Sequence, residues 1–415
     1  MTKSITNVRV YHKVAVGFAF QKDAATAATV SQFMKEADVS FAPGYTEFEP
    51  SGTDGQMFHA RNGHRIAHQE PAVTVQTWCS RTNLAKVLES FTGGQPTASG
   101  TGLTVADAQI TSPVLTGIRP YDHCENVASC QMTLEISSNG SNWDLKLYSE
   151  AAKTSLLASQ ANLADGGTVA MTAQNDSGLT VAGTLASPPT AGDYLVTVKQ
   201  VVYAWANHPH NACLGTFAFD DGYQLHQLDG CHTRGMKLTS GGREGVRLEW
   251  EMAAYDYTYS ATTYNASVED NDYLCSRDLT LLWDEGTLDY SLPTEGSFTI
   301  EGSWDLTPIP DNAAHPEYYK RENPQLSVTA DIPETTESAA IQARARAAGY
   351  NSLKASFDYG DYGLEIDMGD TVADPNVLPE ISGKEFSTNS LVFRARSDAT
   401  DATPSVASIK IDWRA

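Results

Sequence analysis

The sequence predicts a mainly β protein, and three observations lead to this fold class. Residues 216–255 alternate between apolar and polar side chains with a period of two, which is typical of half-buried antiparallel strands. Many further short segments with this pattern are separated by turn residues such as Asn-Gly and Asp-Gly-Gly. Helical periodicity is confined to short stretches. We therefore expect sheets with short flanking helices.

Composition sets the limits of this expectation. The chain has 415 residues, of which 41% are hydrophobic, enough for two or three domains with a packed core. Lys and Arg number 28 against 51 Asp and Glu, a formal net charge of −23. This balance argues against a DNA-gripping surface, which would be basic, although acidity can also simply aid solubility. Residues 1–10 lack the apolar core of a signal peptide and no segment reaches transmembrane length, so we expect no membrane partner.

The first hundred residues contain one clear helix. Leu84, Val87, Leu88 and Phe91 fall at i, i+3, i+4 and i+7, with Thr82 or Asn83 as the expected N-cap and Gly93 as the end. The Ala-rich segment from Asp23 to Glu36 predicts a second, short helix. The remaining pattern predicts strands at 8–20, 39–41, 57–60 and 72–78, a loop at 42–56, a hairpin turn at Asn62-Gly63 and a linker at 95–112.

Residues 113–203 have a different texture, which indicates an inserted Ig-like β-sandwich. Five short strands are expected at regular spacing, with turns at Asn139-Gly140 and at 165–167, but the Cys–Trp–Cys spacing of antibody domains is missing. The predicted strands cover 130–136, 143–148, 168–171, 179–181 and 194–198. The resulting division assigns 1–105 and 205–415 to two halves of one domain and 113–203 to the insert.

The last part of the chain resumes the strand pattern. Val73–Trp78 resembles Phe298–Trp304 in alternation and aromatic placement, which is compatible with a duplicated barrel unit. Further strands are expected around Phe217, Met236 and Val246. Others should cover 279–283, 298–304, 381–396 and 409–413, with a hairpin at 353–370, a short helix at 338–348 and long loops at 256–274 and 307–325.

The alternation near residue 250 assigns side chains to two faces of a strand. Because residues two apart point the same way, one set should pack the core and the other should face water, a lumen or a neighbouring subunit. The core set is Val246, Leu248, Trp250 and Met252, and the outward set is Arg247, Glu249 and Glu251.

The sequence gives little support for catalysis. It contains no P-loop, no GxGxxG after a strand, no GxSxG elbow and no HExxH, so we expect no enzyme and no cofactor. Glu249 and Glu251 could pair as glycosidase carboxylates, but a solvated outer face explains them better.

A metal site is not expected either. His and Cys residues cluster without a recognised zinc spacing, and the acidic residues near 360 lack the DxDxDG order of a calcium loop. The first groups are His59, His64 and His68, then His208, His210 and Cys213, then His226, Cys231 and His232; the acidic group is Asp358, Asp361, Asp367 and Asp370. Cys124 and Cys130 are close enough in sequence to pair, although a cytoplasmic protein would keep them reduced.

The order of these segments resembles the major tail tube proteins of long-tailed, siphovirus-like bacteriophages. The resemblance lies in the strand ending at Trp78 with its LAKVLESF helix, FAFDDGYQLHQLDGC at 217–231, and the MKLTSGGREGVRLEWEMAAY hairpin at 236–255. It continues in TIEGSW at 299–304 and FDYGDYGLEIDM at 357–368. It covers about residues 1–105 and 205–415, and the insert lies outside it.

The resemblance implies a fold and a function. Tail tube subunits are β-barrels or sandwiches flanked by a helix, and their stacked rings conduct the DNA genome during ejection. It implies a virion protein assembled in the host bacterial cytoplasm, with itself, the tape measure, the terminator and the baseplate as partners. Rings contain six single-barrel or three double-barrel subunits, and the length here favours three.

The resemblance also suggests roles for particular residues. An acidic wall would repel DNA phosphates and let the polymer slide, and Glu249 and Glu251 are the lumen-facing candidates. Loop 42–56 or loop 307–325 should reach the next ring. Two other hypotheses remain open, a head decoration or baseplate protein and a carbohydrate-binding β-sandwich with Trp143 and Tyr148 as sugar platforms.

Overall fold

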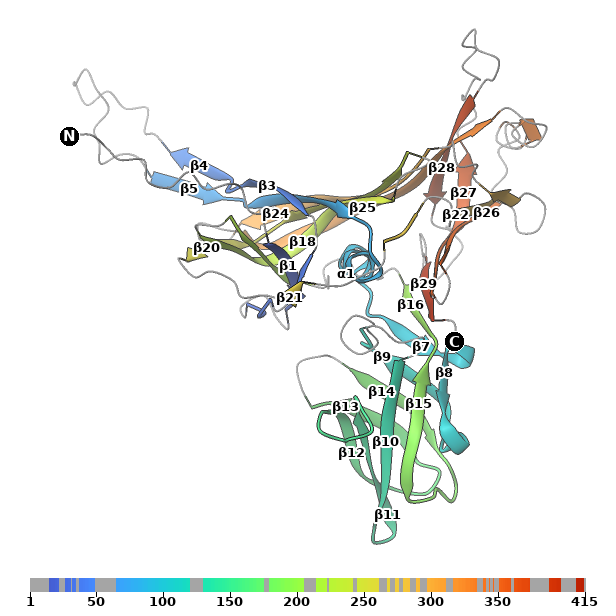
Figure 1. Cartoon of the computed structure of the whole chain (residues 1–415). Coiled ribbons are helices and arrows are strands. Elements are labelled where there is room, and N and C mark those ends of the chain that lie inside the picture. Colours follow the sequence, from blue (N-terminus) through green and yellow to red (C-terminus); the bar gives the residue numbers. More distant parts are fainter. Residues whose placement is uncertain are drawn as a thin grey trace, which may run out of the picture.

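The computed structural model gives the chain an extended, mainly β architecture (Figure 1). It describes residues 15–21, 27–30, 32–34, 37–48, 65–119, 130–174, 179–204, 214–221, 224–241, 245–260, 267–268, 273–275, 279–283, 289–291, 297–310, 316–333, 339–340, 343, 346, 351–359, 362–373, 388–396 and 408–413.

The elements that precede and form the insert are mostly short strands. They are β1 (Ala15–Phe20), β2 (Gln32–Met34), β3 (Asp38–Ala42), β4 (Tyr45–Phe48), β5 (Arg65–Gln69), β6 (Ala72–Trp78), α1 (Arg81–Thr92), β7 (Thr97–Ser99), the 3-10 turn Gly100–Gly102, β8 (Leu103–Val105), the 3-10 turn Ala106–Ala108, β9 (Ile110–Thr116), β10 (Cys130–Asn139), β11 (Asn142–Tyr148), β12 (Leu156–Leu163), β13 (Thr168–Ala173), β14 (Thr180–Leu185), β15 (Gly192–Val198) and β16 (Gln200–Ala204).

The strands that follow the insert are longer. They are β17 (Gly215–Asp220), β18 (Leu225–Ser240), β19 (Arg247–Ala253), β20 (Asp256–Ser260), β21 (Ser267–Val268), β22 (Leu279–Trp283), β23 (Asp289–Ser291), β24 (Phe298–Pro310), β25 (Pro316–Pro333), β26 (Asn351–Tyr359), β27 (Tyr362–Ala373), β28 (Thr388–Arg396) and β29 (Ser408–Trp413).

Strand β18 belongs to two sheets and joins them. Its first half, Leu225 to Asp229, pairs with β17 and β20, whereas its second half, from His232 onward, pairs with β19 and β24. Gly230 lies between the halves with a φ of 64°. This left-handed conformation is readily available to glycine and costly for other residues, so Gly230 allows the strand to pass from one sheet to the other.

The larger sheet is built mainly from the strands that follow the insert. Its neighbours run β3–β6–β19–β18–β24–β25–β28–β27, all antiparallel, and β26, β22 and β29 extend it into a nearly closed, barrel-like arrangement (Figure 1). The second sheet runs β20–β18–β17–β1–β2–β21, where β2 and β21 are parallel.

The insert is an antiparallel β structure that continues the hydrogen-bonded framework of the large sheet. Its strands pair in the order β8–β15–β10–β11–β12–β13–β14–β9. Strand β9 also pairs with β7, which is linked through β16 and β29 to β27. In Figure 1 the insert lies on the far side of α1 from the large sheet.

The linker prediction for 95–112 was wrong. These residues form β7, β8 and the start of β9, with Ala98, Leu103 and Ile110 buried. Sparse apolar residues among Ser, Thr and Gly gave too weak a period for the sequence pattern to reveal three short strands.

Helix α1 begins and ends with standard caps. The Ser80 hydroxyl accepts a hydrogen bond from the Asn83 backbone N–H at 3.2 Å, so the predicted N-cap at Thr82 or Asn83 was wrong. Gly93 has a φ of 68° and its N–H donates to the Glu89 carbonyl, as expected for a C-terminal glycine. The predicted apolar positions, Leu84, Val87, Leu88 and Phe91, are all buried.

Several further predictions are confirmed. The strands at 72–78, 130–136, 143–148, 298–304 and 409–413 and the hairpin at 353–370 are present, as are the turn after Asn139 and the strand part of 381–396 in β28. Residues 339, 340, 343 and 346, the described part of the predicted helix 338–348, are helical.

Other predictions were wrong. The helix expected over 23–36 contains strand β2, which pairs with β1 and β21, because tertiary pairing overrides local propensity. The expected loop 307–325 is largely β24 and β25, and parts of loops 42–56 and 256–274 form β4 and β20. The predicted strand 57–60 and the Asn62-Gly63 turn lie outside the described residues.

We predict that Gly230→Ala destabilises the protein strongly. A Cβ atom there would lie 1.9 Å from Tyr255 Cδ2, in addition to the backbone strain of the positive φ. Gly140→Ala is the matched control, because Gly140 has a φ of 68° but nothing within 4 Å of the added Cβ. Urea unfolding should show a loss of about 3 kcal/mol or more for Gly230→Ala and about 1 kcal/mol for Gly140→Ala. Equal losses would contradict the role of Gly230 at the sheet junction.

Candidate functional site

The large sheet has one buried face and one polar face. On β19 the expected alternation is present, with Leu248, Trp250 and Met252 at most 2% exposed and Glu249 and Glu251 partly exposed. The neighbouring strands repeat the pattern, so their apolar side chains share the buried face: Val73, Val75, Met236, Leu238, Ile300, Trp304, Leu326, Val328, Leu391 and Phe393.

The strand register aligns polar side chains in a row across the opposite face. Because directly paired residues of antiparallel strands point to the same side, the row can be read from the pairing. It runs Asp38, Gln76, Glu249, Lys237, Glu301, Ser327 and Arg394, from β3 to β28. A shorter parallel row runs Ser40, Thr74, Glu251, Gly235 and Ser303. We call these two rows the polar face.

Acidic groups are in excess on the polar face. In the two rows the carboxylates are Asp38, Glu249, Glu251 and Glu301, and the cations are Lys237 and Arg394. A third cation, Arg247, lies beside the rows with its guanidinium 4.6 Å from the centre of the Trp78 ring. Gln76 Nε2 donates to Glu249 Oε2 at 2.8 Å, which orients that carboxylate.

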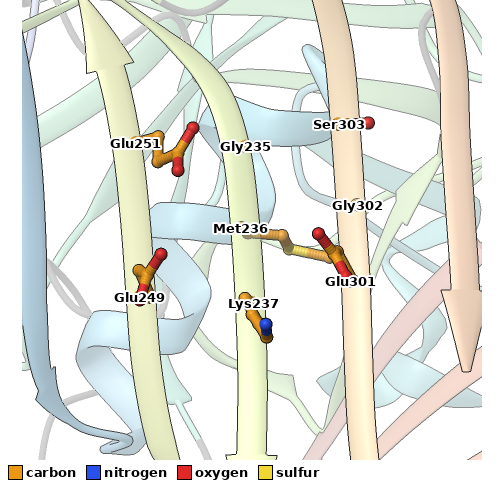
Figure 2. A pocket seen from close by; sticks show the side chains of 8 residues that line it. All are labelled: Gly235, Met236, Lys237, Glu249, Glu251, Glu301, Gly302 and Ser303. Carbon is orange, nitrogen blue, oxygen red and sulfur yellow. The ribbon is translucent and has the colours of Figure 1, made fainter. Parts of the chain in front are cut away.

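A shallow pocket of about 100 Å³ lies at the centre of the polar face (Figure 2). Gly235 leaves room there, and Glu249, Glu251 and Glu301 surround Lys237. The two sequence-predicted residues, Glu249 and Glu251, therefore lie together, and the sheet adds Glu301, which the sequence pattern did not single out. Its strand was predicted, but its register against Lys237 depends on long-range pairing.

A buried polar centre lies behind the sheet, around the end of α1. Arg321 on β25 is 1% exposed and donates from its NH2 group to the Ser90 carbonyl at 3.0 Å and from NH1 to the Phe91 carbonyl at 3.4 Å. Trp304 Nε1 donates to the Phe91 carbonyl at 2.9 Å. Ser90 and Thr233 share a 2.6 Å hydrogen bond between hydroxyls. The Arg321 and Trp304 donors satisfy carbonyls that a helix end leaves without an intrahelical partner.

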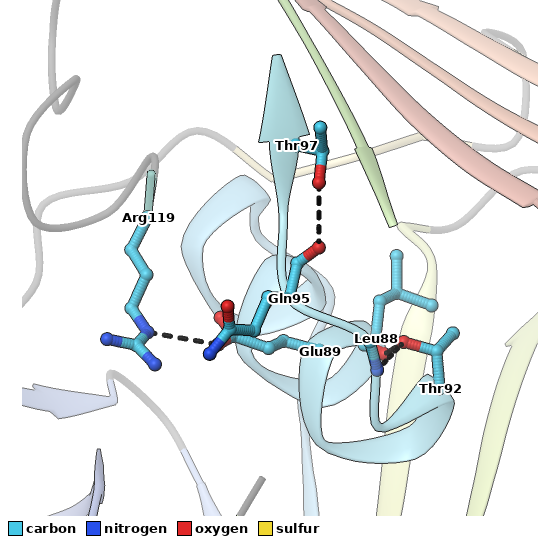
Figure 3. Close-up of polar contacts among 7 residues, drawn as sticks. Leu88, Glu89, Thr92, Gln95, Thr97 and Arg119 are labelled. Atoms are coloured by element: carbon cyan, nitrogen blue, oxygen red, sulfur yellow. Dashed lines mark hydrogen bonds and ion pairs between the residues drawn. The ribbon is translucent and has the colours of Figure 1, made fainter. Parts of the chain in front are cut away.

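The same helix is tied to the start of the insert. The Arg119 guanidinium is 3.0 Å from the buried Glu89 carboxylate (Figure 3). It also lies over the Phe20 ring, 5.0 Å from the ring centre. Thr92 donates to the Leu88 carbonyl at 2.8 Å within the helix. The polar side chains of α1 are thus covered, since Lys86, Glu89 and Ser90 are at most 4% exposed.

His232 is a buried titratable group of this centre. It is 2% exposed, and its Nε2 is 2.7 Å from the Tyr255 hydroxyl. Its Nδ1 has no hydrogen-bond partner among the described residues. Burial, with a smaller contribution from the Arg321 charge, lowers the pKa of His232 well below its ordinary value of 6.5.

The other candidate residues do not form a described site. No group of three or more His, Cys, Asp or Glu side chains that could hold a metal occurs among the described residues, and most members of the first two His clusters lie outside them. Cys79 and Cys231 are free and buried. Cys130 is disulfide-bonded, contrary to the expectation of a reduced thiol, and its partner lies outside the described residues.

The two aromatic residues considered as sugar platforms have polar partners. Trp143 Nε1 donates to Asp165 Oδ1 at 2.6 Å, and the Tyr148 hydroxyl donates to Glu135 Oε2 at 3.2 Å. Both side chains are partly buried. Their rings therefore belong to the framework of the insert rather than to a freely exposed aromatic platform.

Comparisons with known proteins leave the family open. Neither protein-family models nor curated protein sequences give a match to this chain. Among the described residues, no helix has both the length and the apolar character needed to span a bilayer.

We predict that acid destabilises the protein partly through His232. The pKa of His232 is lowered in the folded protein, so below pH 6.5 the imidazole binds a proton in the unfolded chain but not in the folded chain. The free energy of unfolding therefore decreases as the pH falls below this value, by up to about 1.4 kcal/mol per pH unit. Urea unfolding of His232→Gln between pH 7 and 5 should show a shallower dependence than the native protein. An identical slope would contradict this assignment.

Proposed function

We propose that this protein is a structural subunit whose copies close into rings that stack as a hollow tube, of the kind found in bacteriophage tails. The observation that carries the proposal is the polar face, a broad antiparallel surface with a mainly apolar reverse side. Such a sheet can line an aqueous channel, because its backbone hydrogen bonds are satisfied between strands and its apolar side chains are buried on the opposite face. The sequence resemblance to tail tube proteins supports the same function.

The edges of the large sheet fit this assembly. Strand β3 pairs only with β6 among the described strands, so its outer edge is open for another strand. A ring of subunits that pairs such edges removes the exposed backbone groups that otherwise promote uncontrolled aggregation. The paired strands β4 and β5 continue the β3–β6 pair beyond the ends of those strands and would offer an arm to a neighbouring subunit (Figure 1).

The charge of the polar face fits the passage of DNA. Glu249, Glu251 and Glu301 would line the channel and repel phosphates, so that the polymer moves through without binding. The net charge of −23 favours the same outcome over the rest of the particle. On this proposal the ring contains three or six copies, and the insert lies on the outside.

Electron microscopy of the purified protein tests the assembly. We expect hollow tubes of uniform width after concentration, with the insert as outer projections. Deletion of residues 113–203 should remove the projections and leave the tubes. Binding to added phage capsids without tube formation would favour a head decoration protein, and persistently monomeric protein that binds a glycan array would favour the carbohydrate-binding hypothesis.

The channel charge has its own test. We expect Glu249→Lys with Glu251→Lys to leave tube formation intact and to make tubes retain short double-stranded DNA on sedimentation, with retention lost at high salt. The control carries Lys at Gln131, Thr168, Thr180 and Ala191, exposed positions of the insert. Both variants raise the net charge by about four. If the control tubes retained as much DNA, the polar face would not be the channel wall.

A further inference from the structure

Among the described strands, β20 stands at an edge of the second sheet. It pairs with β18 and with no other described strand. Its last residues, Thr258, Tyr259 and Ser260, are exposed, and Tyr259 has 64% of its surface open to solvent. An open strand edge offers unpaired backbone donors and acceptors to another extended chain.

An ordered aromatic layer lies beside this edge. The His226 ring is stacked between Phe219 and Tyr257, with centroid distances of 4.5 and 5.9 Å and planes within 8°. His226 Nδ1 is 2.7 Å from the Tyr257 hydroxyl and Nε2 is 3.1 Å from Asp221. Tyr259 continues the layer at 6.2 Å from Tyr257. The layer is held on both sides of the imidazole, so it is already formed before any partner arrives.

Only acidic charges occur in the described residues of this sheet. The strands β1, β2, β17, β20 and β21 and the first half of β18 contain no described Lys or Arg, but they hold Asp220, Asp229 and Asp256. Asp229 lies directly opposite Asp256 in the β18–β20 pairing, an arrangement that is unfavourable for two like charges. The side-chain donors that reach Asp229 are neutral, Gln227 and Thr216. Burial and, to a lesser extent, the Asp256 charge raise the pKa of Asp229.

We propose that the β20 edge is a docking site for an extended segment, rich in Lys or Arg, of a partner protein. Backbone pairing would supply affinity, and cations of the segment would meet the Tyr257 and Tyr259 rings on one face of the sheet and the Asp229–Asp256 pair on the other. Charge complementarity selects a basic partner over a second copy of this chain, whose net charge is −23. The β20 edge belongs to the second sheet, whereas the polar face belongs to the large sheet. This proposal therefore does not depend on the tube proposal.

Two labelled peptides test this site on the full-length, unassembled protein. One alternates valine and lysine over about seven residues, and its twin alternates valine and glutamate. Fluorescence anisotropy at low salt should show binding of the lysine peptide and none of the glutamate peptide. Tyr259→Lys should weaken binding about tenfold or more, because it removes a ring and adds a like charge. Leu195→Lys is the matched control, an exposed apolar strand residue of the insert, and should bind normally.

Three results would overturn the proposal. They are equal binding of both peptides, failure of the lysine peptide to bind, and unchanged binding by Tyr259→Lys. A concentration-dependent dimer in analytical ultracentrifugation that Tyr259→Lys abolishes would assign the edge to a second copy and would also overturn it. Circular dichroism of Tyr259→Lys should match the native protein, so that a loss of binding reports the edge and not unfolding.

Discussion

The hydrogen bonds from Arg321 to the last carbonyls of α1 are the interaction on which the rest of the structure depends. The last turn of α1 contains no basic residue, so its carbonyl ends and the associated negative dipole have no local partner. Arg321 reaches them from a strand 231 residues away in the sequence. Burying a guanidinium is costly unless it is well bonded, and these carbonyls supply that compensation.

With its end satisfied, α1 can lie entirely within the protein. Phe91 packs against the sheet where Gly302 leaves space, since a Cβ atom there would be 2.4 Å from Phe91 Cζ. The Ser90–Thr233 bond continues to Trp250, whose Nε1 donates to Thr233 at 2.8 Å. The helix therefore covers the apolar side of the large sheet, and the other side is left free to be polar. Arg119 and Glu89 connect the insert to the same helix.

The sequence pattern predicts features that depend on near neighbours. Leu248, Trp250 and Met252 alternate with Glu249 and Glu251 within one strand, so the two faces could be assigned before any strand pairing was known. The apolar positions of α1 follow in the same way. Segment 23–36 was misassigned because its composition favours a helix, whereas pairing with β1 and β21 makes part of it a strand.

Features that depend on distant pairing could not be predicted. Nothing near Arg321 in the sequence indicates that it meets the end of α1, and nothing near Glu301 indicates its place beside Lys237. The sequence does not distinguish His232 from the other histidines, although the fold buries it. The sequence thus predicts the apolar and polar faces of individual strands and helices, whereas the contacts of each face depend on the tertiary structure.

The central claim is that the polar face lines a closed channel, and thiol labelling tests it most directly. A single cysteine at Glu249 should react with a small maleimide in both free and assembled protein. It should react with a maleimide on a bulky carrier only before assembly, because the tube wall excludes the carrier. A cysteine at Thr168, an exposed residue of the insert, should react with both reagents in both states. Equal access of the carrier to position 249 after assembly would contradict the account.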